Sequence, residues 1–161
     1  MHEGERIQAH VVSVWRESRK LLSLGGREGM LLLTDRRLAF VHKTSAKINW
    51  WNAVTQRQVL GFLRSRDTMI RHDGYGEREL AEDLGNPKNV DVPLHDILDV
   101  GSEDAAWGSV LHLEYEAGGR RERYRYSVAQ DWVKYPVKEP TKYMKVDWRP
   151  FVRYVRERSG R

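Results

Sequence analysis

Cysteine is absent from this chain of 161 residues. Disulfides, thiolate metal ligands and cysteine nucleophiles are therefore excluded. Long hydrophobic runs are also missing, since no stretch approaches the roughly 20 apolar residues that a membrane-spanning helix needs. The amino terminus is polar and has no apolar stretch of signal-peptide length. We therefore expect a cytoplasmic protein, with peripheral contact to a membrane surface as the alternative location.

Recognisable catalytic and metal-binding motifs are lacking as well. The six histidines are isolated, and none has the spacing of a zinc site or of a nucleophile's partner. His95, Asp96 and Asp99 form the nearest approach to a cluster, which we interpret as polar residues facing outward from a strand. Gly25–Gly29 precedes a strand-like stretch, whereas a phosphate-binding loop normally feeds a helix. We expect no enzyme activity, no metal and no cofactor.

The charge is modest overall but uneven along the chain. The formal net charge is +5, and residues 118–161 hold thirteen Lys and Arg against five acidic residues. A basic segment of this kind favours an acidic partner, or it forms a solvated face. At this length we expect one domain over residues 1–161.

A hairpin is predicted around residues 29–41. Two apolar runs, Met30–Leu33 and Leu38–Val41, flank the polar residues 34–37, where an Asp favours a turn. Further strands are predicted at Ile7–Trp15, at Leu21–Leu24 and within Val90–Val100. Pro93 restricts pairing in the last of these to an edge or to the residues that follow it.

A second hairpin has the best-defined register. Residues 109–117 and 120–128 flank Gly118-Gly119, which supplies the positive φ angles of a two-residue turn. Symmetrical pairing gives one apolar face and one charged face, and a one-residue slip would break both patterns. The predicted pairs are Leu113–Tyr124, Leu111–Tyr126, Glu116–Arg121, Glu114–Arg123 and His112–Arg125.

Helices are predicted at Asn52–Arg64, Gly76–Leu84 and Asp147–Arg158. In the last, Trp148, Phe151, Val152 and Val155 form one apolar stripe. The apolar residues of the first helix spread around most of its circumference, so we expect it to be covered on more than one side. Its cover is either the strand core or a second chain.

Two short motifs carry a family resemblance. Leu33-Thr34-Asp35-Arg36-Arg37-Leu38 and Pro93-Leu94-His95-Asp96-Ile97 resemble elements of GRAM and pleckstrin-homology-like (PH-like) domains. The resemblance covers about residues 7–42 and 93–158. It implies an α+β, mainly β fold: a seven-stranded bent sandwich or barrel with a carboxy-terminal capping helix. A helical insertion, about residues 43–92, follows the fourth strand, and a long loop spans about residues 129–146. Adaptor or membrane-associated roles are implied across the family.

Aromatic residues in the insertion and the long loop are the candidate partner-binding residues. We expect the face they build to bind another protein or a second copy of this chain. Packing of the same rings in the core is the alternative. The candidates are Trp50, Trp51, Phe62, Trp132 and Tyr143.

Basic residues near the first strand and in the long loop suggest a second function. The resemblance places anion-binding residues on the first two strands and their connection, and lysines interleaved with aromatic rings suit anionic lipid or nucleic acid. The alternative is a solvated surface. The candidates for binding anionic lipid are Arg16, Arg19, Lys20, Lys134, Lys138, Lys142 and Lys145. Nucleic-acid binding by the basic carboxy-terminal segment is the third possibility.

Overall fold

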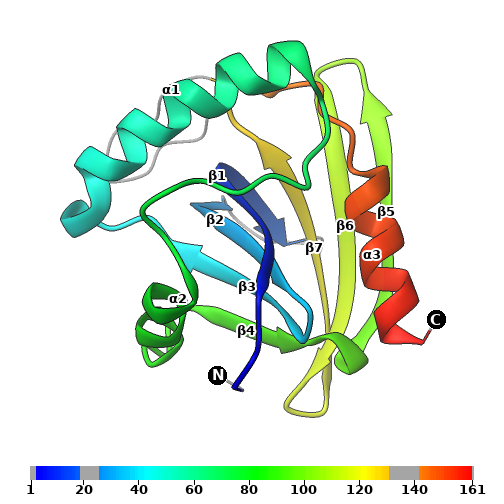
Figure 1. Cartoon of the computed structure of the whole chain (residues 1–161). Coiled ribbons are helices and arrows are strands. Elements are labelled where there is room, and N and C mark those ends of the chain that lie inside the picture. The colour runs from blue at the N-terminus through cyan, green and yellow to red at the C-terminus, as the bar shows by residue number, and fades with distance from the viewer. Residues whose placement is uncertain (1–2, 19–25, 131–141, 161) are drawn as a thin grey trace.

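The computed structural model describes residues 3–18, 26–130 and 142–160. Within them, seven strands form one antiparallel sheet in the order β4-β3-β2-β1-β7-β6-β5. The strands β2–β4 run across the direction of β5 and β6, so the sheet folds over on itself (Figure 1). The strands are β1 Ile7–Ser18, β2 Gly26–Thr34, β3 Arg37–His42, β4 Val90–Pro93, β5 Ile97–Ala105, β6 Gly108–Ala117 and β7 Arg120–Val128.

Three α-helices accompany the sheet in the described residues. Helices α1, Ile48–Arg64, and α2, Glu77–Leu84, follow the second strand of the predicted first hairpin, and α3, Arg149–Ser159, follows β7. In Figure 1, α1 crosses one end of the sheet and α3 lies beside β5 and β6. This arrangement confirms the predicted α+β, mainly β architecture, with seven strands, a helical insertion and a carboxy-terminal helix. No helix among these residues combines the length and apolarity needed to cross a membrane.

The apolar run of β2 is buried on both of its faces. Leu31 and Leu33 belong to the core inside the folded sheet, whereas Met30 and Leu32 belong to a second core. That second core also contains Trp51 of α1, so the helical insertion covers the outer side of β1–β3. A strand covered on both faces reads as a continuous apolar run rather than as an alternating pattern.

The β6–β7 hairpin has the predicted register. All five predicted pairs are present, from Leu111 opposite Tyr126 to Glu116 opposite Arg121. Gly118 and Gly119 have φ angles of 57° and 77°, which suit glycine in a two-residue turn. Local patterning alone therefore specified this part of the sheet.

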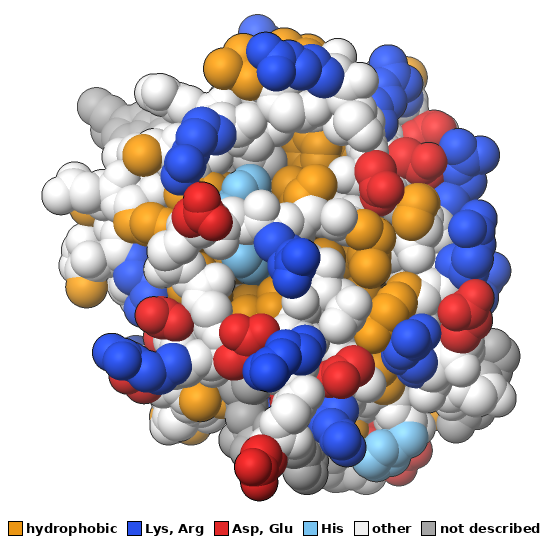
Figure 2. All heavy atoms as spheres, in the orientation of Figure 1, with side chains coloured by type: hydrophobic (Ala, Val, Ile, Leu, Met, Phe, Trp, Pro, Cys, Tyr) orange, Lys and Arg blue, Asp and Glu red, His pale blue; other side chains and the backbone are white. Residues whose placement is uncertain are grey.

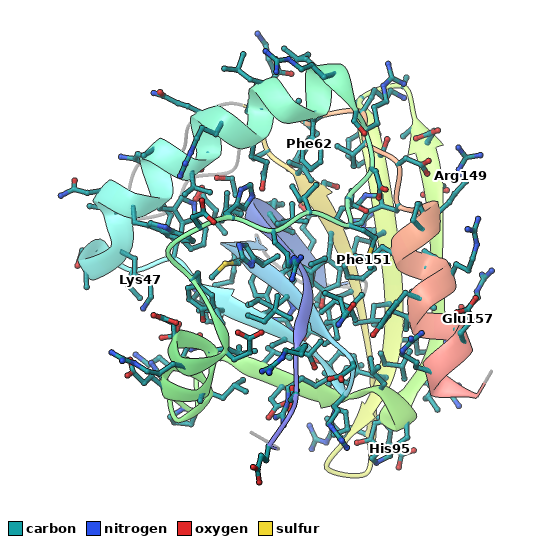
Figure 3. All side chains as sticks on the ribbon, viewed as in Figure 1. Lys47, Phe62, His95, Arg149, Phe151 and Glu157 are labelled. Carbon is teal, nitrogen blue, oxygen red and sulfur yellow. The ribbon has the colours of Figure 1, made fainter. Side chains whose placement is uncertain are left out.

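Helix α3 closes the folded sheet with the predicted stripe. Trp148, Phe151, Val152 and Val155 are all buried. Figure 3 shows Phe151 pointing toward the sheet, while Arg149 and Glu157 point away from it. Asp147 lies one residue before the N-cap Trp148, and its carboxylate oxygen accepts the backbone N–H of Arg149 at 3.0 Å.

Three of the predicted strand positions remain to be compared with the observed strands. β1 extends past Trp15 to Ser18, and the predicted strand Leu21–Leu24 lies outside the described residues. β4 ends at Pro93 and pairs with β3 at one edge of the sheet, which is where a proline is tolerated.

Candidate functional site

Helix α1 has an unusual distribution of side chains. Its inward face buries Thr55 and Gln58 beside Trp51, Val54 and Phe62. Its outward face exposes Leu60 and Leu63, whose side chains are 60% and 71% accessible to solvent. In Figure 2, hydrophobic side chains lie next to Lys and Arg side chains along the upper edge, where the second half of α1 runs. With the inward face buried, no part of the chain that the structure describes covers these two large apolar residues.

The polar residues under α1 serve an irregular stretch of β1. The pairing of β1 with β2 is interrupted between Val11 and Val14, and Ser13 has a φ of 56°. Gln58 accepts the N–H of Val12 at 2.8 Å and donates to its carbonyl at 2.7 Å. Because a bulge removes backbone groups from the ladder, a side chain must satisfy them when they are buried. Gln58 therefore anchors α1 to β1.

The serine of this bulge is also bonded to α1. Its hydroxyl lies 2.8 Å from the Thr55 hydroxyl, and the Trp51 indole N–H donates to it at 3.1 Å. These bonds hold the rotation of α1 about its own axis. They consequently fix which side chains of the helix face outward.

A histidine pair extends the same network. The backbone N–H of His72 donates to His10 Nε2 at 2.6 Å, and the His72 ring lies 3.0 Å from Gln58 Oε1. Burial, followed for His10 by repulsion from His72, lowers the pKa of both imidazoles to about 4. Both rings are therefore neutral at pH 7, and they line a surface pocket of about 780 Å³ between β1 and the connection before α2.

An apolar groove adjoins the outward face of α1. Its volume is about 540 Å³, and Val59 and Leu60 contribute its apolar wall. The complete lining is Asn52, Thr55, Gln56, Val59, Leu60 and Gln130. The exposed cations Arg57 and Arg64 lie on the same helix. We call Leu60, Leu63 and this groove the α1 surface.

The candidate partner-binding residues do not form one surface. Trp51 and Phe62 are 0% and 3% exposed, so the prediction that they contact a partner is corrected: both pack in the core. Trp50 is half-buried, and its indole N–H donates to the Asp73 carbonyl at 3.0 Å. Tyr143 is half-buried against Trp107, and Trp132 lies outside the described residues.

Sequence reasoning missed the leucines' exposure and overlooked Trp107. Trp107 is 53% exposed in the two-residue turn between β5 and β6, and its ring centroid lies 5.3 Å from that of Tyr143. A tryptophan just before Gly108, in a turn between two strands, was the available signal. Turns lie at the protein surface, so a tryptophan in a turn is expected to be exposed to solvent.

A basic pocket lies at the end of the sheet where β2 begins and β3 ends. Its volume is about 540 Å³, and its lining is Arg27, Glu28, His42, Lys43, Thr44, Asn86, Lys88 and Asn89. Lys43 and Glu28 form a buried ion pair at 3.0 Å. Burial, and then the charges of Arg16, Arg27 and Lys88, lower the pKa of His42. The exposed cations Arg27 and Lys88 give this pocket a positive potential.

The candidate lipid-binding residues are only partly placed. Arg16 is half-buried with its guanidinium 3.5 Å from the Tyr124 ring centroid, so packing already engages it. Lys142 and Lys145 are exposed. Arg19, Lys20, Lys134 and Lys138 lie outside the described residues.

The described residues offer little support for a metal-binding or acid–base site built from histidines and carboxylates. They contain no group of three or more His, Asp or Glu side chains arranged to hold a metal ion. His95 Nε2 lies 3.5 Å from Asp96 Oδ1 on an exposed turn. The expectation of a non-enzymatic protein without cofactors stays a prediction.

Comparison with known proteins adds a likeness in structure but none in sequence. No protein-family model matches the sequence, and no curated protein matches it. Among solved structures, the Vps36 N-terminal PH domain is similar, with a TM-score of 0.49 and 13% sequence identity. The similarity covers 99% of this chain and 83% of that one. At this identity the likeness carries nothing about ligand or partner, and the narrower resemblance to GRAM domains stays a prediction.

Proposed function

We propose that this chain is a non-catalytic binding module that recognises another protein through the α1 surface. The observation that carries the proposal is the exposure of Leu60 and Leu63 on a helix whose rotation is fixed by buried hydrogen bonds. A helix that merely covered a core would turn its leucines inward. Contiguous exposed apolar side chains beside a groove favour recognition of an apolar segment.

Charge selects among the protein partners. Arg57 and Arg64 flank the exposed leucines, so a partner with acidic residues beside its apolar ones gains favourable contacts. In a symmetric contact of two α1 helices, the same arginines would face each other. A different protein, carrying an acidic amphipathic helix, is therefore favoured over a second copy of this chain.

A displayed library of amphipathic helical peptides tests this function. We expect the wild-type chain to enrich peptides with apolar residues at i, i+3, i+4 and i+7 and with acidic flanks, and the variant Leu60→Ser/Leu63→Ser to lose them. Arg78→Ser, an exposed change on α2, is the matched control and retains them. Equal enrichment by the wild type and the double variant would contradict the proposal. Sedimentation over a concentration series would reveal self-association, which would replace the heterologous partner with a second copy.

The basic pocket favours a second candidate function, peripheral binding to anionic lipid. Arg27 and Lys88 face solvent near His42, and attraction to phosphate groups falls with salt. We expect the chain to sediment with anionic vesicles, to be released by salt, and to lose binding in Arg27→Ser/Lys88→Ser. Sedimentation that is equal for neutral vesicles, or unchanged in this variant, would remove the candidate.

Nucleic-acid binding has weaker support from the described residues. On β7, Arg121 and Arg123 pair with Glu114, and Arg125 pairs with Glu17. These ion pairs reduce the charge that the strand offers to phosphate. A fluorescence titration with single-stranded and duplex oligonucleotides should show no salt-sensitive change at micromolar protein.

A further inference from the structure

A small pocket with aromatic walls shares no lining residue with the α1 surface or the basic pocket. Its volume is about 260 Å³, and it is lined by Trp15, Glu17, Trp107, Arg125, Ser127 and Tyr143. The strand pairing explains four of these positions, since Trp15 is opposite Ser127 and Glu17 is opposite Arg125. Trp107 comes from the β5–β6 turn, and Tyr143 from the segment that bridges to Ala129. Three distant parts of the chain thus each supply one aromatic ring.

The aromatic walls are set by close packing. The rings of Trp107 and Tyr143 lie at an interplanar angle of 66°, so they form two walls that meet at an angle. A Cβ on Gly108 would lie 2.7 Å from Tyr143 Cβ, and one on Gly26 would lie 2.6 Å from the Trp15 indole nitrogen. Such distances leave no room for a larger side chain, so glycine allows both rings to sit where they do.

The polar groups of the pocket are a carboxylate and a guanidinium that compensate each other. Arg125 Nη2 lies 3.0 Å from Glu17 Oε2, and the Trp15 indole N–H donates to Glu17 Oε1 at 3.3 Å. Arg125 Nε is buried and has no hydrogen-bond partner among the described residues. The Glu17 carboxylate is the anionic group of the pocket and Arg125 already pairs with it, so a cationic ligand would compete with Arg125 for Glu17.

We propose that this pocket binds a quaternary ammonium group, as found in trimethyllysine and choline. Aromatic faces attract such a cation, and enclosure is strongest where the cation is desolvated. A trimethylammonium group has no N–H, so enclosing it leaves no donor without a partner. An unmodified lysine would need acceptors for three donors, and the acceptor side chains in the lining are Ser127, Tyr143 and Glu17, the last of which already pairs with Arg125. Small-molecule pockets usually span roughly 300–1,000 Å³, so this one suits a single headgroup.

The matched pair of choline and 3,3-dimethylbutan-1-ol tests the proposal, because the two differ in charge but hardly in shape. The indole N–H signals of the isotope-labelled full chain, assigned with Trp107→Phe, report binding by NMR. We expect saturable shifts with choline and at least about tenfold weaker binding of the neutral alcohol. Absence of saturable shifts at tens of millimolar choline, or equal binding of the alcohol, would overturn the proposal.

Variants of the lining residues should change choline affinity in opposite directions, which a purely structural role of these residues would not predict. Trp107→Ala and Glu17→Gln should weaken choline binding about threefold to thirtyfold, the range that one cation–π or exposed ionic contact supplies. Arg125→Gln should tighten it, because the Glu17 carboxylate is then free for the ligand. Arg78→Ser on α2 should leave it unchanged. The NMR spectra show whether each variant folds like the wild type. If the folded Arg125→Gln variant binds choline more weakly than the wild type, the assignment of Arg125 as a competitor is contradicted.

Two further titrations identify the source of the group. A trimethyllysine peptide that binds more tightly than its unmodified counterpart, with no effect of phosphatidylcholine vesicles, assigns the pocket to a modified protein. The reverse result assigns it to a lipid headgroup. Failure of both, together with failure of free choline, removes the site and leaves the α1 proposal untouched.

Discussion

Helices α1 and α3 both pack against the sheet, but they differ in which side chains they bury. α3 turns Phe151, Val152 and Val155 to the core and its charged residues to solvent. α1 buries Thr55 and Gln58, while Leu60 and Leu63 face outward. The buried polar pair completes the hydrogen bonds of the β1 bulge, whereas nothing within the described residues accounts for the outward leucines. Comparison of the two helices thus separates residues that the fold needs from residues left over for binding.

Truncation of the α3 stripe should give the largest effect on stability. Phe151→Ala leaves a cavity among fully buried side chains, and we expect it to lower the free energy of unfolding by about 3–5 kcal/mol. Urea denaturation monitored by circular dichroism measures this. The exposed change Glu157→Ala on the same helix is the control and should stay within about 0.5 kcal/mol of wild type. A loss below about 1 kcal/mol for Phe151→Ala would mean that α3 does not seal the sheet.

Acid should weaken the α1 side of the molecule. The folded-state pKa values of His10 and His72 are lowered from 6.5 to about 4, so the unfolded chain binds more protons between these values. The stabilising contribution is complete above pH 6.5 and is lost as the pH falls toward 4. At about 1.4 kcal/mol per pKa unit, the buried His10 alone accounts for about 3 kcal/mol.

Urea denaturation at several pH values between 6.5 and 5 measures this loss. Carboxylates with ordinary pKa values contribute little in that range, whereas burial raises the pKa of Glu28, so the test is the difference between wild type and a histidine variant. We expect the slope of stability against pH to become smaller in His72→Gln, which keeps the backbone bond to His10. A slope equal to that of wild type would show that the histidines do not carry the acid sensitivity.

Removal of the polar anchor of α1 should have a smaller effect. Gln58→Ala leaves the N–H and carbonyl of Val12 buried without partners, and we expect a loss of about 2 kcal/mol. Gln56→Ala, on the exposed face of the same helix, is the matched control. If thermal unfolding finds the two variants equally stable, Gln58 does not anchor the helix to β1.

The outward leucines should contribute almost nothing to stability. Leu60→Ser/Leu63→Ser should unfold within about 0.5 kcal/mol of wild type while losing the peptides selected by the α1 surface. A large loss of stability would instead assign these leucines to the folded core. Phe151→Ala and the double leucine variant should therefore differ most in their loss of stability, which makes them the most direct test of the difference between α3 and α1.

Sequence patterns predicted the elements whose evidence is local. The β6–β7 register follows from charges and apolar residues that alternate about a Gly-Gly turn, and the α3 stripe follows from helical spacing. Both patterns repeat within a few residues, so no distant contact is needed to interpret them. The helical insertion was also predicted, with α1 beginning four residues earlier than expected.

The candidate site was predicted less well, because it depends on contacts between distant segments. The wheel of α1 carries apolar residues on several sides, and only the bulge at Ser13 decides that Gln58 faces inward and Leu60 outward. Trp51 and Phe62 were therefore assigned to a binding surface that they do not reach. Trp107 went unnoticed because its meaning comes from Tyr143 and Trp15, which are remote in sequence.

By itself, the sequence determined the hairpin around residues 29–41, the β6–β7 register and the helix that closes the sheet, because alternation and helical spacing are properties of neighbouring residues. Tertiary structure alone decided which side of α1 faces solvent and which aromatic rings meet around a pocket. Those outcomes depend on how one backbone irregularity in β1 is satisfied and on which strands lie side by side. Neither is encoded in a local pattern, since both arise only when segments far apart in the chain are packed together.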